Sequence, residues 1–143
     1  MDKKLFNRIT REIFTQYGFS KTGNNFILIL DKVSIVVALR SWRGVKSFDY
    51  YFSINELYDP STPIVKRSDT DFEIKMEHSP LASGYHKHEI LYEEYDESEY
   101  RELLTNLLHT HLDPYKKDAL KYLKDNDHCM CLSKKARKHL GLI

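Results

Sequence analysis

The chain has little of what disulfide-stapled, fibrous or disordered proteins need. Its 143 residues include two cysteines, five glycines and four prolines. Such a composition excludes collagen-like repeats and low-complexity disorder. Cys129 and Cys131 are separated by one residue, a spacing too short for an unstrained disulfide bridge, so a secreted fold held by disulfides is excluded as well. We expect both cysteines to be free thiols that pack as small buried apolar side chains.

Net charge and long apolar runs are missing too. The chain carries 22 Lys and Arg against 21 Asp and Glu, which gives a formal net charge of +1. A protein with so little net charge has no overall field that would attract nucleic acid or an anionic membrane. The N-terminus turns polar again at Asn7, so it offers no apolar segment for export or for spanning a bilayer. We therefore expect a cytoplasmic protein without membrane contact.

The composition is that of one packed domain. Hydrophobic residues make up 41% of the chain and charged residues 30%. A chain of this length can bury roughly 70% of the surface that its unfolded form exposes. No internal repeat, linker or low-complexity segment interrupts the sequence. We therefore expect a single domain over residues 1–143.

Two periodicities predict the fold class. Apolar residues at helical spacing predict helices over 3–17, from 96 to about 111, from 114 to 126 and over 133–140. Alternating or continuous apolar residues predict strands over 26–30, 33–42, 47–57, 72–76 and 85–93. Because the strands are grouped before the last helices, the fold class is α+β. We expect an N-terminal helix, an antiparallel meander sheet of about five strands, and C-terminal helices packed mainly on one face.

The junction between the first helix and the first expected strand carries a family resemblance. The sequence there reads Gly18-Phe19-x-Lys21-x-Gly23-Asn24-x-Phe26, and an apolar strand and an aromatic strand follow it. This pattern, which covers roughly the first half of the chain, resembles bacterial proteins grouped as domain of unknown function family 4304. The resemblance implies a small cytoplasmic bacterial α+β domain. It implies no catalytic residues, because that family has no established activity.

A His-x-His pair is the strongest metal-binding feature. His86 and His88 fall in an expected strand, where residues two apart point to the same face and both imidazoles could bind one transition metal. A third ligand could come from Glu94, which has the same parity, from His78, or from His128. No known zinc spacing is present, so a structural or surface role for these histidines is the competing interpretation.

Basic and aromatic residues support a second alternative, the binding of single-stranded nucleic acid. Stacking on aromatic rings combined with phosphate contacts is how proteins hold single strands. The chain has two clusters of this kind, and the candidate residues are Arg40, Trp42, Arg43, Lys46, Lys134, Lys135, Arg137 and Lys138. The signature of an RNA-recognition motif is absent, because an acid, Asp49, stands where that motif has a small neutral residue.

The chain contains no motif for common enzyme chemistry. It has no Gly-x-Ser-x-Gly, no Gly-x-Gly-x-x-Gly and no phosphate loop, which argues against a nucleophile elbow, dinucleotide redox chemistry and nucleotide hydrolysis. We expect no catalytic residues and no cofactor. The leading hypothesis is a non-enzymatic binding or accessory module, of the kind that immunity proteins represent, whose partner is another protein.

Overall fold

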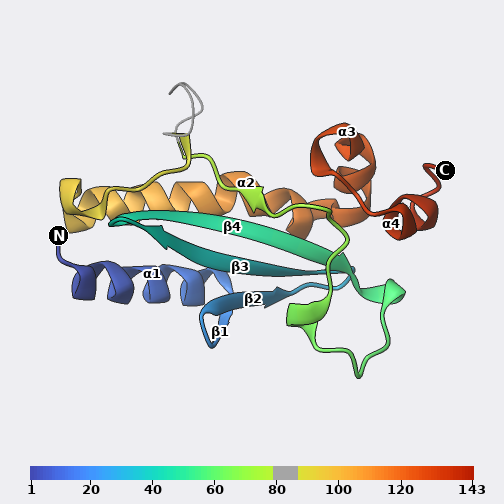
Figure 1. The fold of residues 1–143 in the computed structure, drawn as a ribbon, viewed down its shortest axis with the longest axis horizontal. Helices are drawn as coiled ribbons and strands as arrows, with labels where there is room; N and C mark the ends of the chain where they lie inside the picture. Colours follow the sequence, from blue (N-terminus) through green and yellow to red (C-terminus); the bar gives the residue numbers. More distant parts are fainter. Residues whose placement is uncertain (79–86) are drawn as a thin grey trace.

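A computed structural model describes residues 1–78 and 87–143 of the chain (Figure 1). The helices and strands follow in the order α1 (Lys3–Tyr17), β1 (Ser20–Thr22), β2 (Asn25–Ile29), β3 (Val33–Trp42), β4 (Val45–Ile54), β5 (Ile74–Lys75), α2 (Glu97–Asp125), α3 (Asp127–Met130) and α4 (Lys134–His139). Short 3-10 helices lie between them: η1 (Asn55–Leu57), η2 (Ile64–Lys66) and η4 (Tyr92–Glu94). The α+β class is confirmed.

The strands form one antiparallel sheet of five in the order β1-β2-β3-β4-β5. Every strand pairs with its neighbour in the chain, so the sheet is a meander, as expected. The longest pairing joins β3 to β4 over ten residue pairs, from Val33↔Ile54 to Trp42↔Val45. This pairing fixes which side chains share a face, because side chains alternate along each strand.

Several strand predictions differ from the structure. No strand is predicted before residue 26, yet Ser20–Thr22 forms β1, and Lys21 pairs with Phe26 of β2 across a turn at Gly23, whose φ is 60°. The strand expected over 47–57 ends at Ile54, and the one expected over 72–76 is reduced to Ile74–Lys75. The strand expected over 85–93 is wrong for residues 87–93, and its first two residues lie outside the described chain. Only Ile90 pairs with β4, at Lys46, and Tyr92–Glu94 is a 3-10 helix. Two residues further along the edge of β4, the hydrogen-bonding position is occupied, because the Phe48 carbonyl accepts the Met76 N–H at 2.9 Å.

Helix α1 follows the prediction closely. The Asp2 carboxylate caps its first turn by accepting the Leu5 N–H at 2.8 Å. Gly18, with φ of 120°, ends it by donating to the carbonyls of Phe14 and Thr15. The stripe of buried residues on α1 is Phe6, Ile9, Thr10, Ile13, Phe14 and Tyr17.

Helix α2 is longer than either helix predicted for its range. It starts at the expected capping box of Asp96 and Glu99 and continues through Pro114. The prediction that a new helix opens at Pro114 is therefore wrong. Tyr115, which directly follows Pro114, is buried on the core side. The break comes at exposed Asp118, whose φ and ψ of −158° and 88° are not helical. Its carboxylate accepts the Lys121 N–H at 3.3 Å and caps the last turns.

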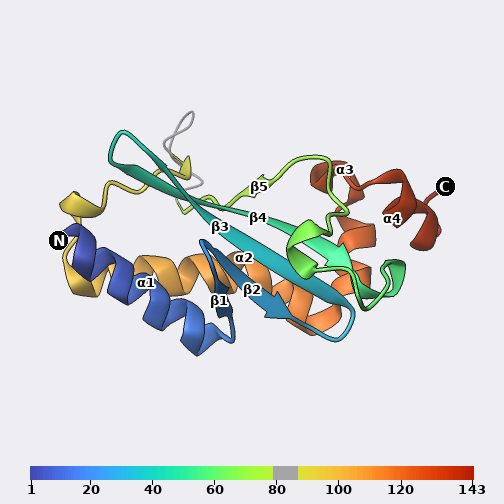
Figure 2. The same cartoon turned by 60° about the horizontal axis from the view of Figure 1, so that its bottom comes forward.

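Both long helices cover the same face of the sheet, which we call the inner face (Figures 1 and 2). Phe14 of α1 stacks on Phe26 of β2, with ring centroids 4.2 Å apart, and lies 5.3 Å from Phe48 of β4. Tyr115 of α2 packs 5.6 Å from Phe52. The main hydrophobic core therefore lies between the inner face and the two helices.

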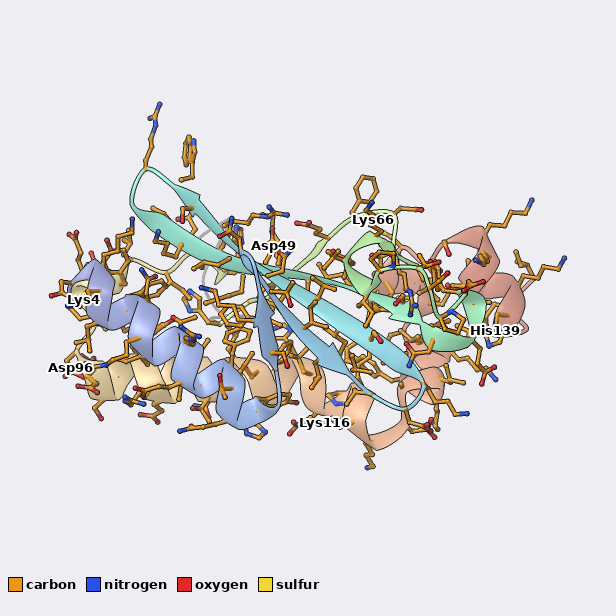
Figure 3. All side chains as sticks on the ribbon, turned by 90° about the horizontal axis from the view of Figure 1, so that it is seen from below. Lys4, Asp49, Lys66, Asp96, Lys116 and His139 are labelled. Carbon is orange, nitrogen blue, oxygen red and sulfur yellow. The ribbon has the colours of Figure 1, made fainter. Side chains whose placement is uncertain are left out.

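The opposite, outer face is covered along half its length by the segment between η1 and β5. Figure 3 places Lys66 of η2, like Asp49 of β4, on the side of the sheet away from Lys116 of α2. Asp69, which is 1% exposed, anchors the segment by accepting the Ile54 N–H at 2.8 Å and the Tyr58 hydroxyl at 3.0 Å. Burial and the Asp69 carboxylate raise the pKa of Tyr58 to about 12.

Asp69 also holds the C-terminal end of the chain. Its carboxylate accepts the Ser133 hydroxyl at 3.2 Å, and its carbonyl accepts the Ser133 N–H at 2.8 Å. Ser133 caps α4 by accepting the Ala136 N–H, which confirms the predicted start of the last helix. Across residues 1–78 and 87–143, none of the helices combines the length and apolarity that crossing a membrane requires.

Candidate functional site

The turn between β3 and β4 presents the only tryptophan of the chain. Arg43 and Gly44 form the turn with φ of 49° and 81°, so a non-glycine residue occupies the left-handed region at Arg43. Trp42 is 69% exposed, and the Arg43 guanidinium lies 4.9 Å from the centre of its ring. The hairpin lies at the end of the molecule opposite to α4 (Figure 1). It combines a large aromatic side chain and an arginine at an exposed tip.

The outer face next to this hairpin is hollow. By strand alternation, Arg40 and Trp42 of β3 share the outer face with Ser47 and Asp49 of β4. Asp49 also pairs with Lys75 of β5. The cavity has a volume of about 230 Å³, and its lining consists of Arg40, Ser41, Trp42, Val45, Ser47, Asp49, Lys75, His88 and Glu89. We call it the outer-face hollow.

Asp49 stands out in this hollow because its carboxylate is buried and incompletely hydrogen-bonded. It is 7% exposed, and its Oδ1 atom has no hydrogen-bond partner among the residues described. Its Oδ2 atom lies 3.9 Å from Arg40 Nε, beyond hydrogen-bond distance. The Arg40 guanidinium instead donates from Nη2 to the Glu73 carboxylate. Burial raises the pKa of the Asp49 carboxyl, an effect that the nearby Lys75 charge opposes.

The candidate residues for nucleic-acid binding fall in different places. Arg40, Trp42 and Arg43 lie together at the hairpin end. Lys46, by contrast, is only 8% exposed and lies on the inner face, where its Nζ donates to Ser41 Oγ at 2.7 Å. Burial, with a smaller effect of Lys3, lowers the pKa of the Lys46 amine. Lys46 therefore does not share a surface with the other three.

The basic residues of α4 lie at the far end of the molecule, and two of the four are engaged within the chain (Figure 1). Lys135 donates from Nζ to the Leu57 carbonyl at 2.6 Å. Arg137 pairs with Asp127 at 3.3 Å, while Lys134 and Lys138 are exposed. The structure thus does not join the two predicted basic clusters into one surface.

The residues proposed for metal binding are also separated. His86 lies outside the described residues. His88 lines the outer-face hollow, Glu94 is exposed on η4, and His128 is exposed on α3 at the opposite end. In the described chain, no three His, Cys, Asp or Glu side chains gather as a metal site would require. Binding through the His-x-His pair stays a prediction.

The cysteine prediction is wrong in one respect. Cys129 and Cys131 are free thiols, as expected, but both are exposed. The residue between them, Met130, is the buried one, and its sulfur accepts a hydrogen bond from the Tyr115 hydroxyl at 3.7 Å. Both thiols thus lie on the surface on either side of a buried methionine at the end of α3.

A larger cavity lies elsewhere, along α2. Its volume is about 610 Å³, and its lining includes the carboxylates of Glu77, Glu99 and Glu102. No side-chain atom found buried and unpaired in the described residues belongs to this lining. The outer-face hollow differs because Asp49, whose buried Oδ1 atom has no hydrogen-bond partner among the described residues, is one of its lining residues.

Sequence reasoning missed the role of Asp49, Glu73 and Lys75. Asp49 stood out only as a charged residue inside an aromatic strand, between Phe48 and Tyr50. That is the one signal that could have singled it out, because a strand with one buried face seldom carries a carboxylate without a reason. Its pairing with Lys75 depends on the register of β5, which the sequence pattern does not fix.

Comparisons with known proteins give no relative. No protein-family model matches the chain, and neither a curated protein nor a solved structure does. The resemblance to domain of unknown function family 4304 therefore stays a prediction.

Proposed function

We propose that this protein is a cytoplasmic, non-enzymatic binding module whose partner is another protein. The observation that carries the proposal is the exposed Trp42 at the rim of the outer-face hollow. Tryptophan and arginine are the residue types most enriched among the few side chains that dominate binding energy at protein interfaces. Both occur together at this hairpin tip.

A second exposed aromatic residue extends the surface. Phe72 is 73% exposed and directly precedes Glu73, whose carboxylate holds Arg40. We define the outer-face surface as Arg40, Trp42, Asp49, Phe72 and Glu73. It combines two exposed aromatic residues and an arginine, types that are enriched at protein interfaces, with carboxylates whose charge can select a complementary partner.

A capture experiment with matched variants tests the proposal. Tagged wild-type protein is incubated with native cytosol, and the retained proteins are compared with those retained by Trp42→Ala. Ile29→Ala is the control, because Ile29 is 66% exposed but lies on β2 near the other end of β3. We expect one stoichiometric protein with the wild type and with Ile29→Ala, and its loss with Trp42→Ala. Equal capture by all three proteins contradicts the proposed surface.

Nucleic-acid binding is the competing outcome at the same hairpin. A titration with labelled single-stranded RNA and DNA at low salt distinguishes the two. We expect no binding below about 100 µM, weak even for non-specific association. Tighter binding that falls steeply with salt and is lost in Trp42→Ala would assign the surface to nucleic acid instead.

A further inference from the structure

The unpaired carboxylate of Asp49 indicates a missing hydrogen-bond donor. Buried carboxylates in proteins are normally paired or hydrogen-bonded, because burial without partners is costly. Asp49 is nine-tenths buried, and its Oδ1 atom has no partner within residues 1–78 and 87–143. Rotation about the Cβ–Cγ bond is soft, so either oxygen of the group can be presented to the hollow. A donor that enters the hollow would therefore complete the site.

Neither Arg40 nor Lys75, two described cations near Asp49, donates a hydrogen bond to its Oδ1 atom. Arg40 is the nearest, but its guanidinium is committed to Glu73, and its Nε stays 3.9 Å from the Asp49 carboxylate. Lys75 faces Asp49 across the β4–β5 pair and acts on it through its charge, while its side chain is exposed.

The shape of the hollow favours a single side chain as its occupant. Its volume of about 230 Å³ is below the roughly 300–1,000 Å³ of pockets that hold small-molecule ligands. Its rim carries the flat indole of Trp42, which already receives the Arg43 guanidinium at 4.9 Å on one side. An aromatic rim and a buried carboxylate are the two groups that a guanidinium can contact at once.

We propose that the outer-face hollow receives an arginine side chain of the partner protein, whose guanidinium donates to Asp49 and stacks beside Trp42. This inference rests on the proposed protein-binding function. A guanidinium fits better than an ammonium, because its planar donors can bond both oxygens of a carboxylate and because it is less strongly hydrated. Glu73 has a supporting role: it keeps Arg40 from taking the place of the incoming arginine.

The test uses a single-residue probe, N-acetyl-arginine-N-methylamide, titrated into the isotope-labelled protein and followed by amide and indole NMR. We expect saturable shifts at the Trp42 indole N–H and the Asp49 amide, with a Kd on the order of 10 mM, as befits one side chain. The corresponding citrulline derivative, which is uncharged, and the lysine derivative are expected to bind at least tenfold more weakly. Equal binding of either derivative, or no shifts at all, overturns the inference.

Variants of the hollow sharpen the test. Asp49→Asn keeps the shape of the side chain and is expected to weaken probe binding at least tenfold. Glu73→Gln releases Arg40 toward Asp49 and is expected to do the same, whereas Lys75→Gln removes a competing charge and should tighten binding about twofold. The control is Glu56→Gln, because Glu56 is an exposed acid that pairs with Lys32 outside the hollow. Unchanged binding in both Asp49→Asn and Glu73→Gln contradicts the site.

The two proposals fail in different ways. If the protein binds the arginine probe but captures no protein, the proposed function is wrong and the arginine site stands as a ligand site. If Asp49→Asn captures the partner as well as the wild type does, the partner does not use this site, and the inference alone is overturned.

Discussion

Asp69 and Asp49 are both buried on the outer side of the sheet, but the hydrogen bonding of their carboxylates differs. Asp69 is 1% exposed and accepts hydrogen bonds from Ile54, Tyr58 and Ser133. Asp49 is 7% exposed, and one of its oxygens has no donor in the described chain. Asp69 lies where the segment after η1 folds back over the sheet, and Asp49 lies where that cover has ended. The hydrogen-bonded Asp69 carboxylate fastens the fold, whereas the Asp49 carboxylate is where we propose that a partner contributes a donor.

The two faces of β4 show the same contrast on a larger scale. The inner side chains Phe48, Tyr50 and Phe52 are at most 2% exposed, and the Tyr50 hydroxyl is paired with that of Tyr115 at 2.9 Å. On the outer side, Asp49 and Ser53 each have a buried oxygen atom without a partner among the described residues. The inner face is therefore well packed with its buried hydroxyl paired, whereas the outer face keeps buried polar atoms without partners among the described residues.

The largest expected effect comes from the inner face. Phe48→Ala removes a fully buried ring that packs against Phe14, and we expect it to lower the free energy of unfolding by about 3–5 kcal/mol. Chemical denaturation measures the change. Trp42→Ala on the exposed hairpin tip is the comparison and is expected to stay within about 0.5 kcal/mol of the wild type. A similar loss in both variants would contradict the assignment of the core to the inner face.

The second largest effect on stability is expected at Asp69, which holds the segment after η1 on the outer face. Asp69→Asn weakens charge-assisted hydrogen bonds to Tyr58 and Ser133 and should lower the free energy of unfolding by about 2 kcal/mol. Hydrogen exchange should quicken in α4 and in the segment after η1, with α1 unaffected. Asp59→Asn is the control, since Asp59 is exposed and its carboxylate accepts hydrogen bonds from Ser61 within its own turn. Uniform loss of protection over the whole chain would argue against a local role for Asp69.

A smaller effect is expected from the buried hydroxyl pair of the inner face. Tyr50→Phe leaves the Tyr115 hydroxyl without its 2.9 Å partner and should cost about 1 kcal/mol of stability. Tyr115→Phe should cost a similar amount, and the double variant should cost less than the sum of the two. A double-mutant cycle by denaturation measures this coupling. Strict additivity would mean that the two hydroxyl groups do not stabilise each other.

The smallest expected effect is a gain in stability, where the other variants lose stability, and it comes from replacing Asp49. Burial raises the pKa of this carboxyl above its ordinary value of 3.8, so the folded protein holds the proton more tightly than the unfolded chain does. Its contribution to stability is thus fully present below pH 3.8 and is lost as the pH rises through the folded-state pKa. Asp49→Asn should be more stable than the wild type at pH 7, by up to about 1 kcal/mol, and no more stable in acid. Denaturation at both pH values measures the difference, and a variant less stable at pH 7 would refute the account.

The sequence was a good guide wherever one face of an element is buried. The stripe on α1 and the helix starts at Asp96 and Ser133 were all predicted, because each depends on residues within a turn or two of one another. The errors have different origins. β1 was missed although its pairing with β2 is local, because the three exposed residues Ser20–Thr22 carry no apolar alternation. The continuation of α2 past Pro114 was missed where Tyr115 packs against Phe52 of the sheet, a contact between remote segments.

The candidate site was predicted only in part. Arg40, Trp42 and Arg43 were singled out from the sequence as a basic aromatic cluster, and they do lie together. Lys46 was grouped with them by its position in the chain, but the alternation of β4 turns it to the inner face. Asp49 and Glu73 were not predicted as site residues, because only the register of the strands brings Glu73 within reach of Arg40.

By itself the sequence determined the α+β class, the meander and the exposed hairpin, because apolar periodicity and turn residues act locally. Only the tertiary structure decided that one aspartate would be satisfied and the other left without a donor. That difference depends on how far the segment after η1 extends over the outer face. It also depends on Glu73, which lies beside Arg40 although the two residues are far apart in the chain. Such meetings depend on packing between remote segments, which no local pattern of residues encodes.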